Sequence, residues 1–414
     1  MKRLLSLLLL PVVLVGALSA CGQPLPSGTT TTAPVLQLAF MRNDDGRSGY
    51  TEEDFHRAYL RLSLELLTSQ SAGENVLLSP FSILMAMTMV ANGADGETLR
   101  QMEATLGDGM PIARLTLLLN ELSARLAAEP DAKLHQANSA WYADDGSITP
   151  HQAFLDELTQ VYEALVSQVD FTDPATVDLI NRWVSDNTHG MIERILDQIP
   201  EEAVMYLINA LAFEADWQSP YREGNIRSAP FTNRDGTVTT VQMMYSEEST
   251  YLSLPGVKGF LKPYKGGQYS FLALLPDGDA DDFVESLDAD GWAALFASRV
   301  PGVVVSAGIP QFTSAFDCRL NDALEALGIT DAFDPNRADL SLIAPQLYIS
   351  RVLHKTFIQV DGLGTRAGAV TAVEVGVTSI RETTPVILDR PFVYAIIDND
   401  THLPLFVGTM SRMD

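Results

Sequence analysis

The sequence predicts an α+β fold, and two observations lead to this prediction. The chain has 414 residues, of which 46% are hydrophobic and 19% are charged, so it is long and apolar enough to bury a large core. Helical periodicity dominates the first half of the chain, whereas β-rich runs dominate the second half. Helices and strands that are segregated along a chain favour α+β over a regular alternation of strand and helix.

Helices are predicted at several places in the first half. Ser79 places an N-cap before a first-turn proline, Pro80, and an apolar run follows to Val90. Asp95 opens a second helix, which Gly107 ends. The other helical patterns cover Glu52–Leu67, Ile112–Ala128, Gln152–Tyr162 and Val177–Thr188.

Strands are predicted in the second half, where β-branched and aromatic residues gather in short runs. No linker, repeat or low-complexity stretch follows Tyr50, so residues 51–414 are expected to form a single domain. The predicted strands are Val204–Phe213, Thr237–Met244, Ser270–Leu275, Val303–Ile309, Leu347–Val360, Phe392–Ile397 and Leu405–Thr409.

The first residues read as a targeting signal rather than as part of the fold. Two basic residues precede an apolar run over 4–18 that is short for a retained transmembrane helix. The run ends in LSAC, which resembles the bacterial lipobox, so residues 1–20 are predicted to be a lipoprotein signal peptide and Cys21 to carry the lipid. The alternative is an ordinary cleaved signal peptide.

Residues 21–50 are rich in Gly, Pro, Thr and Ser and are predicted to be a flexible tether. The domain is therefore expected outside the cytoplasm, either anchored to a membrane by its lipid or in secreted or periplasmic form. The formal net charge of −26 disfavours a nucleic-acid partner, and its dispersion along the chain favours a role in solubility.

Catalytic and cofactor motifs are absent from the sequence, which predicts that the protein is not an enzyme and needs no cofactor. The pattern Gly362-x-Gly364-x-x-Ala367 resembles half a dinucleotide fingerprint, but a β-rich run follows it where a helix is required. The six histidines are scattered singly without metal-ligand spacing, so no metal site is predicted. Cys318 is expected to be a small buried apolar residue rather than a nucleophile.

The stretch GTRAGAVTAVEVGVTS, residues 364–379, has an unusual pattern. Taken with a period of two, its odd positions from Thr365 to Val377 are all small or β-branched and uncharged, while both charges, Arg366 and Glu374, lie on the even face. Loop-like sequences flank the stretch on both sides. The pattern fits either an ordinary strand between turns or a segment that occupies two states.

Several ordered motifs make the chain resemble the serpin family from about Thr51 onward. These are NVLLSPFSI (75–83), GADGET (93–98), NALAFEADW (209–217), LHK (353–355), RPF (390–392) and PLFVG (404–408). The resemblance implies a large central β-sheet, smaller sheets, about nine helices and an exposed reactive-centre loop. It further implies a monomeric inhibitor of serine-type endopeptidases that acts as a suicide substrate.

The resemblance assigns the quoted stretch to the hinge and the reactive-centre loop. Counting along the loop places the scissile bond at Thr378-Ser379, with Ile380 and Arg381 as alternatives because the segment up to Arg390 is longer than is common. The residues implied as the hinge are Gly364, Thr365, Arg366, Ala367, Gly368, Ala369, Val370 and Thr371.

Other positions match polar and aromatic sites of the family. Ser79, Ser82, Asn209 and His354 match the polar cluster, called the shutter, where the sheet opens, and Trp217 matches the breach, where insertion begins. Buried polar satisfaction and a core aromatic are the alternatives.

The target and the mode of action also leave alternatives. Thr378 implies an elastase-like or subtilisin-like protease, whereas Arg381 implies a trypsin-like one. A cross-class inhibitor of cysteine proteases and a non-inhibitory serpin that binds or supports other molecules remain as alternative functions. The hinge also departs from the family, because Gly362, Leu363 and Arg366 stand where acidic residues are usual.

Overall fold

The structure is a computed structural model that describes residues 49–300, 302–365 and 383–413. All of these residues belong to one compact unit, Pro34–Asp414. The predicted signal peptide and nearly all of the predicted tether lie outside the described residues, so neither prediction is tested. No helix in the described part of the chain is long and apolar enough to cross a membrane.

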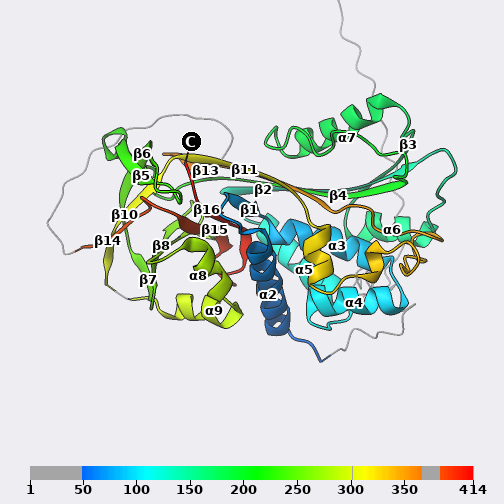
Figure 1. Cartoon of the computed structure of the whole chain (residues 1–414), viewed down its shortest axis with the longest axis horizontal. Coiled ribbons are helices and arrows are strands. Elements are labelled where there is room, and N and C mark those ends of the chain that lie inside the picture. The colour runs from blue at the N-terminus through cyan, green and yellow to red at the C-terminus, as the bar shows by residue number, and fades with distance from the viewer. Residues whose placement is uncertain (1–48, 301, 366–382, 414) are drawn as a thin grey trace, which may run out of the picture. The chain divides into compact units, whose positions relative to one another are not determined.

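Helices are most frequent in the first half of the chain, as predicted, and several have the predicted caps (Figure 1). Ser79 caps the helix that begins at Pro80, and its hydroxyl accepts a hydrogen bond from the backbone N–H of Ser82. Thr51 and Asp54 form a capping box at the first described helix. The described α-helices are α2 (Glu52–Gln70), α3 (Pro80–Asn92), α4 (Gly96–Gly107), α5 (Ile112–Ala127), α6 (Gln152–Val161), α7 (Pro174–Asn187), α8 (Ala280–Ser286), α9 (Ala289–Ala297) and α10 (Asn321–Ala326).

The described strands form three sheets, which confirms the predicted α+β class. The large sheet has the order β11-β12-β13-β4-β2-β3, a second six-stranded sheet has the order β1-β16-β15-β9-β8-β7, and a four-stranded sheet has the order β14-β10-β6-β5. The large sheet consists of β2 (Ala132–Ala143), β3 (Leu165–Val169), β4 (Met205–Asp216), β11 (Phe312–Arg319), β12 (Leu353–Val360) and β13 (Gly364–Thr365). The others are β1 (Val76–Leu78), β5 (Ile226–Thr232), β6 (Val238–Glu248), β7 (Thr250–Leu254), β8 (Val257–Pro263), β9 (Tyr269–Pro276), β10 (Val304–Pro310), β14 (Thr383–Ile387), β15 (Phe392–Asp398) and β16 (Pro404–Met410).

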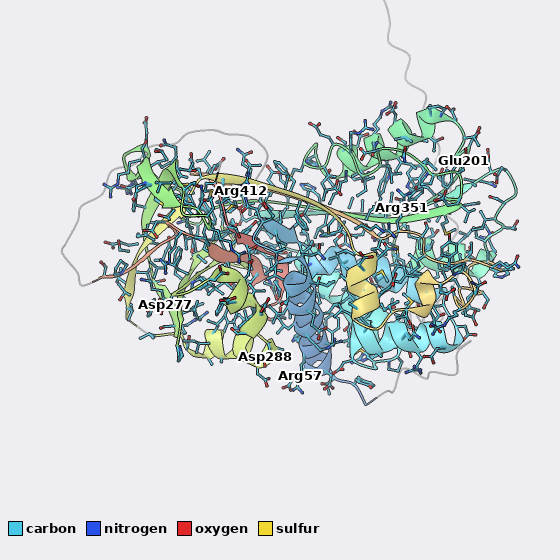
Figure 2. All side chains as sticks on the ribbon, viewed as in Figure 1. Arg57, Glu201, Asp277, Asp288, Arg351 and Arg412 are labelled. Atoms are coloured by element: carbon cyan, nitrogen blue, oxygen red, sulfur yellow. The ribbon has the colours of Figure 1, made fainter. Side chains whose placement is uncertain are left out.

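The large sheet is covered on both faces (Figure 1). Helix α3 packs between β4 and β16 on one face and belongs to the main core. On the opposite face, α7 and the segment after it pack on β2 and β4 through a separate apolar cluster that includes Trp141, Ile180 and Ile208. Charged side chains such as Arg57, Asp277 and Asp288 project from the surface (Figure 2). A strand added between β4 and β12 would face the main core on the side where α3 packs.

One predicted strand is wrong in part. The strand predicted over Leu347–Val360 begins only at Leu353. The backbone before it is held by a side chain, because Asn321 donates to the Ser350 carbonyl at 3.0 Å and accepts from the Val352 N–H at 2.9 Å. These backbone groups therefore bond to an amide instead of a neighbouring strand.

The segregation of helices and strands is also less complete than predicted. Strand β2 has twelve residues in the helix-rich half, and α8, α9 and α10 lie in the strand-rich half. The sequence of β2, AKLHQANSAWYA, has no β-branched residue and favours a strand only at Trp141 and Tyr142, so local propensity gives little indication of a strand of this length. Its position between β3 and β4 supplies ladder partners on both sides.

Candidate functional site at the head of the large sheet

The first two residues of the predicted hinge already form a short strand in the large sheet. β13 lies between β12 and β4, where Thr365 pairs with Val360 on one side and with Ala215 on the other. The Thr365 side chain is fully buried, and its hydroxyl lies 2.6 Å from the Tyr264 hydroxyl. The odd-numbered face of the stretch therefore begins with an inward-facing residue.

Gly364 is required by the close approach of β4 to this strand. A Cβ atom at this position would lie 2.0 Å from the Ala215 carbonyl oxygen and 2.8 Å from the Asp216 Cα. Real side chains do not tolerate such separations from backbone atoms, so only glycine fits while β13 is paired with β4.

The turn that leads into β13 is held by hydrogen bonds from two directions. The Asp361 carboxylate accepts from the backbone N–H groups of Leu363 at 2.7 Å and of Gly364 at 3.2 Å. The Trp217 N–H donates to the Leu363 carbonyl and the Tyr221 N–H donates to the Gly362 carbonyl, both at 2.7 Å. The entry to the hinge is therefore fixed in position although the family's usual acidic residues are missing there.

Trp217 lies at the centre of an aromatic and charged group beside this turn. Its indole N–H donates to the Asp361 carbonyl at 2.8 Å, and its ring stacks on Tyr264 at 4.5 Å between centroids. The buried Lys262 ammonium lies 4.3 Å from the centre of the Tyr221 ring and 2.8 Å from a carboxylate oxygen of Glu248.

Sequence reasoning did not find the partners of Trp217. Tyr221, Glu248, Lys262 and Tyr264 lie between 4 and 47 residues after Trp217, and none belongs to a local motif. The sequence contains one weak indication of this cluster, because the charged Lys262 interrupts the apolar run of β8. Burial raises the pKa of Tyr264 well above its usual value, so this hydroxyl remains protonated and available to Thr365.

The structure brings the predicted shutter residues together lower in the sheet. The Ser79 N–H donates to the His354 Nε2 at 3.0 Å, and the Ser82 hydroxyl points to the Asn209 carbonyl at 3.5 Å. The Asn209 side-chain amide donates to Asn138 at 2.8 Å. Burial lowers the pKa of His354 to about 3, so its ring is neutral and can accept from Ser79 at neutral pH.

A cavity lies beside the shutter. Among the described strands no ladder joins β4 directly to β12, and β13 (Gly364–Thr365) lies between them at the head of the sheet. A cavity of about 340 Å³ lies between the two strands, lined by residues that include Ser82, Ile208, Asn209, Leu353 and His354. The Asn209 side-chain oxygen is buried and has no hydrogen-bond partner among the described residues.

The remaining predicted site residues lie outside the described part of the chain. These are Arg366 to Thr371 of the hinge, the bond Thr378-Ser379, its alternatives Ile380 and Arg381, and Cys21. The described chain stops at Thr365 on the large sheet and resumes at Thr383 in β14, which pairs with β10 of the four-stranded sheet (Figure 1). Both ends of the predicted loop are thus placed, and they belong to different sheets.

A family model decides the assignment, because the model described as Serpin (serine protease inhibitor) matches residues 58–413. The chain belongs to the serpin family. Among its relatives, human neuroserpin (Homo sapiens) is 29% identical over 363 residues, which cover 83% of this chain and 87% of the relative. Iripin-5 of Ixodes ricinus is 32% identical over 382 residues, which cover 87% of this chain and 95% of the relative.

Solved structures of serpins agree with this fold. The thermophilic serpin tengpin in its native state is 40% identical, with a TM-score of 0.83 over 88% of this chain and 95% of that chain. Tengpin in its latent state has a TM-score of 0.79 over 88% of this chain and 99% of that chain. Thyroxine-binding globulin in complex with thyroxine is only 22% identical with a TM-score of 0.77, over 86% of this chain and 98% of that chain, and shares the fold alone. Serpins are typically inhibitors of serine proteases rather than enzymes.

Proposed function

We propose that this serpin inhibits serine proteases as a suicide substrate. The protease cleaves the reactive-centre loop near Thr378-Ser379, and the serine of the protease becomes esterified to the Thr378 carbonyl. The segment from Arg366 onward then inserts between β4 and β12 as a full strand. The attached protease is displaced and distorted before its acyl bond is hydrolysed.

One observation carries this proposal: Gly364 and Thr365 already pair with both neighbouring strands of the large sheet. Because side chains alternate along a strand, extending β13 would place residues 367, 369, 371, 373, 375 and 377 on the same face as the buried Thr365. All six are Ala, Thr or Val, which can be buried without leaving a charge in the core.

The energy of insertion is large enough to deform a protease. A full strand would form about ten new ladder hydrogen bonds at roughly 1 kcal/mol each, which gives on the order of 10 kcal/mol before side-chain burial. This compares with the roughly 5–15 kcal/mol stability of a whole domain. Distortion that removes the oxyanion hole would raise the barrier to deacylation and leave the acyl-enzyme trapped.

The proposal is tested by mixing the serpin with a panel of elastase-like, subtilisin-like, trypsin-like and papain-like proteases. We expect a complex that survives denaturing electrophoresis with a serine protease, and a C-terminal fragment that begins at Ser379. A fragment that begins at Arg381 or Glu382 would instead place the scissile bond after Ile380 or Arg381. A complex with only the papain-like enzyme would favour the cross-class alternative. Cleavage without any complex across the panel would favour a non-inhibitory serpin.

The location proposed for the inhibitor follows from Cys21. A lipid on this cysteine would hold the domain at a membrane outside the cytoplasm of a bacterial cell, where exogenous proteases act. The LSAC motif supports this location. In a bacterial host, Cys21→Ser is expected to move the protein from the membrane fraction to the soluble fraction, whereas an unchanged distribution would contradict lipid anchoring.

A further inference from the structure

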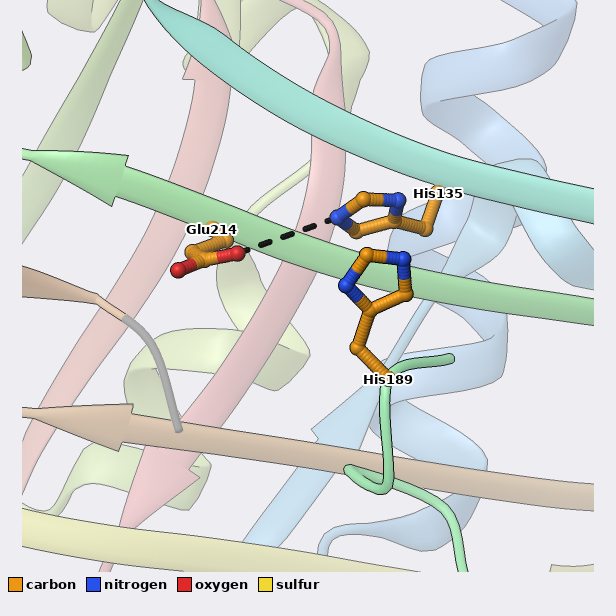
Figure 3. Close-up of side chains that lie close together, drawn as sticks. All are labelled: His135, His189 and Glu214. Carbon is orange, nitrogen blue, oxygen red and sulfur yellow. Dashed lines mark ion pairs between the residues drawn. The ribbon is translucent and has the colours of Figure 1, made fainter. Parts of the chain in front are cut away.

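Two histidines and a glutamate from three separate segments converge on the outer face of the large sheet (Figure 3). His135 lies on β2, Glu214 lies on β4, and His189 follows α7. One potential ligand atom from each residue lies within 4.8 Å of the other two. The His135 Nε2 is 3.8 Å from a Glu214 carboxylate oxygen, and the two imidazole rings are 3.8 Å apart between centroids.

Backbone structure presets this convergence. Glu214 pairs with Lys133, two residues before His135, so Glu214 and His135 are diagonal neighbours on one face of the sheet. His189 has a left-handed backbone (φ 52°) just beyond the end of α7. The turn around it is fixed, because the Gly190 N–H donates to the Ser185 carbonyl at 2.8 Å and the Ile192 N–H donates to the Thr188 hydroxyl at 3.1 Å.

The nitrogen that faces the cluster is ready to bind a ligand. The His135 Nε2 is buried and has no hydrogen-bond partner among the described residues. An unsatisfied buried nitrogen is costly, and a metal ion would remove this cost.

We propose that His135, His189 and Glu214 form a binding site for a divalent transition metal, with zinc as the best match. Two imidazole nitrogens and one carboxylate are a common ligand set for zinc, with water in the fourth position. Tetrahedral ligands at zinc distances lie roughly 3.3 Å apart, so the side chains must close in modestly from their present separation. His189 is exposed, which gives the ion a path from solvent.

A bound ion would tie the segment after α7 to β2 and β4. That segment continues through Ile195 and Leu196, which line the cavity between β4 and β12 and pack in the same apolar cluster as Leu353. The segment after α7 therefore lies beside the gap between β4 and β12, where insertion of the loop is proposed. Metal binding is expected to stabilise the native state and to slow insertion, and the second effect rests on the proposed function.

Calorimetric titration of the full chain with zinc chloride tests the site without any protease. We expect one ion per chain with micromolar affinity, and at least about tenfold weaker binding in His135→Gln, His189→Gln and Glu214→Gln. The matched control is His151→Gln, because His151 is exposed and outside the cluster. Equal affinity in all four variants, or no binding by the wild type, would overturn the proposal.

Two further measurements keep the test independent of folding defects. Cobalt bound at the site should give the strong visible absorption of a tetrahedral ion in the wild type and lose it in His189→Gln, whose side chain is exposed. Lys133→Ala should tighten zinc binding, because the Lys133 ammonium lies 3.9 Å from the Glu214 carboxylate and competes with the ion. Weaker zinc binding in Lys133→Ala would argue against Glu214 as a ligand.

The effect on inhibition is measured separately. Zinc should raise the thermal midpoint of the wild type and increase the number of serpin molecules cleaved per protease trapped, and it should do neither in His189→Gln. If zinc binds but the number of serpin molecules cleaved per protease trapped does not change, the proposed link to insertion is overturned. If the serpin traps no protease at all, the proposed function is refuted, but the zinc site measured by titration is unaffected.

Discussion

Thr365 connects the sheet to the segment that is proposed to enter it. Its side chain is fully buried, its hydroxyl lies 2.6 Å from the Tyr264 hydroxyl, and its backbone pairs with strands on both sides. The partner in this contact is a neutral hydroxyl, so it would not compensate the desolvation of a cation placed here.

Thr365→Arg is therefore expected to convert the inhibitor into a substrate. Insertion would have to bury the new guanidinium, so cleavage and release should win over trapping, and the stoichiometry of inhibition should rise at least about tenfold. Titration of protease activity against serpin measures this ratio. Val238→Arg adds the same charge at an exposed position and should leave it unchanged. Equal trapping by both variants would contradict the inward assignment of Thr365.

His354 makes the stability of the native state depend on pH. The folded protein lowers its pKa from the usual 6.5 to about 3 because the ring is buried, so the unfolded chain binds a proton that the native state excludes. The stabilising effect is present above about pH 6.5 and is lost progressively as the pH falls towards about 3.

His354→Gln should reduce this pH dependence. Glutamine can still accept from the Ser79 N–H but does not titrate. Between about pH 7.5 and pH 5 the free energy of unfolding should fall by about 2 kcal/mol more in the wild type than in the variant. Denaturant unfolding at several pH values measures the difference, and His151→Gln serves as an exposed control. If the free energy of unfolding changes with pH in the same way in the wild type and in His354→Gln, then His354 is not the source of the pH dependence.

Residues within local motifs were predictable, and residues that meet only in three dimensions were not. Ser79, Ser82, Asn209 and His354 stand in recognisable runs, and the structure places them near one another. Tyr264 and Lys262 carry no such signal, because their roles depend on the packing of β8 and β9 beside Trp217.

At the scale of elements, β13 is a strand of two residues that separates two long ones. Its pairing with β4 requires Gly364, since a Cβ there would lie 2.0 Å from the Ala215 carbonyl oxygen. The backbone hydrogen bonds between β13 and β4 can therefore form only if position 364 has no side chain.

Gly364→Ala should detach β13 from β4. We expect a loss of about 1–3 kcal/mol in the free energy of unfolding and a higher stoichiometry of inhibition, because insertion would start from an unpaired hinge. Denaturant unfolding and protease titration provide the two measurements. Gly224→Ala is the matched control, since a Cβ there meets no atom within 4 Å. An unchanged stoichiometry in Gly364→Ala would separate the pairing of β13 from the inhibitory function.

Element boundaries show where sequence patterns are insufficient. The predicted run Leu347–Val360 does end in a strand. The first part of the run is not a strand, because Asn321, which lies outside the run, binds its backbone. β2 was missed because, apart from Trp141 and Tyr142, its residues have low strand propensity and neighbouring strands determine its conformation.

At the scale of the whole molecule, the described part of the large sheet includes β13 only as Gly364–Thr365. The cavity between β4 and β12 and the unpartnered Asn209 oxygen at its edge indicate that the described native arrangement leaves stabilising contacts unmade. Completing the strand should therefore yield a more stable molecule.

Cleavage of the loop should raise the thermal midpoint by at least about 15 °C, given on the order of 10 kcal/mol of new hydrogen bonding. The wild type is cleaved with a protease that it does not trap, and circular dichroism follows unfolding before and after cleavage. The same treatment of Thr365→Arg should give a much smaller rise, because its inserted strand would bury a charge. An unchanged midpoint in the cleaved wild type would show that the strand does not insert.

The sequence by itself determined the fold class, the family resemblance and the alternating pattern of residues 364–379, because periodicity and motifs are local properties of a chain. Tertiary structure alone decided that Thr365 points at Tyr264, that Gly364 touches the backbone of β4, and that His135, His189 and Glu214 meet. These contacts join segments separated by as many as 149 residues, the separation of Gly364 from Ala215, and only the pairing of strands and the packing of α7 bring them together. The spacing of residues along the chain does not predict these contacts, because they depend on both the loop lengths and the register of the strands.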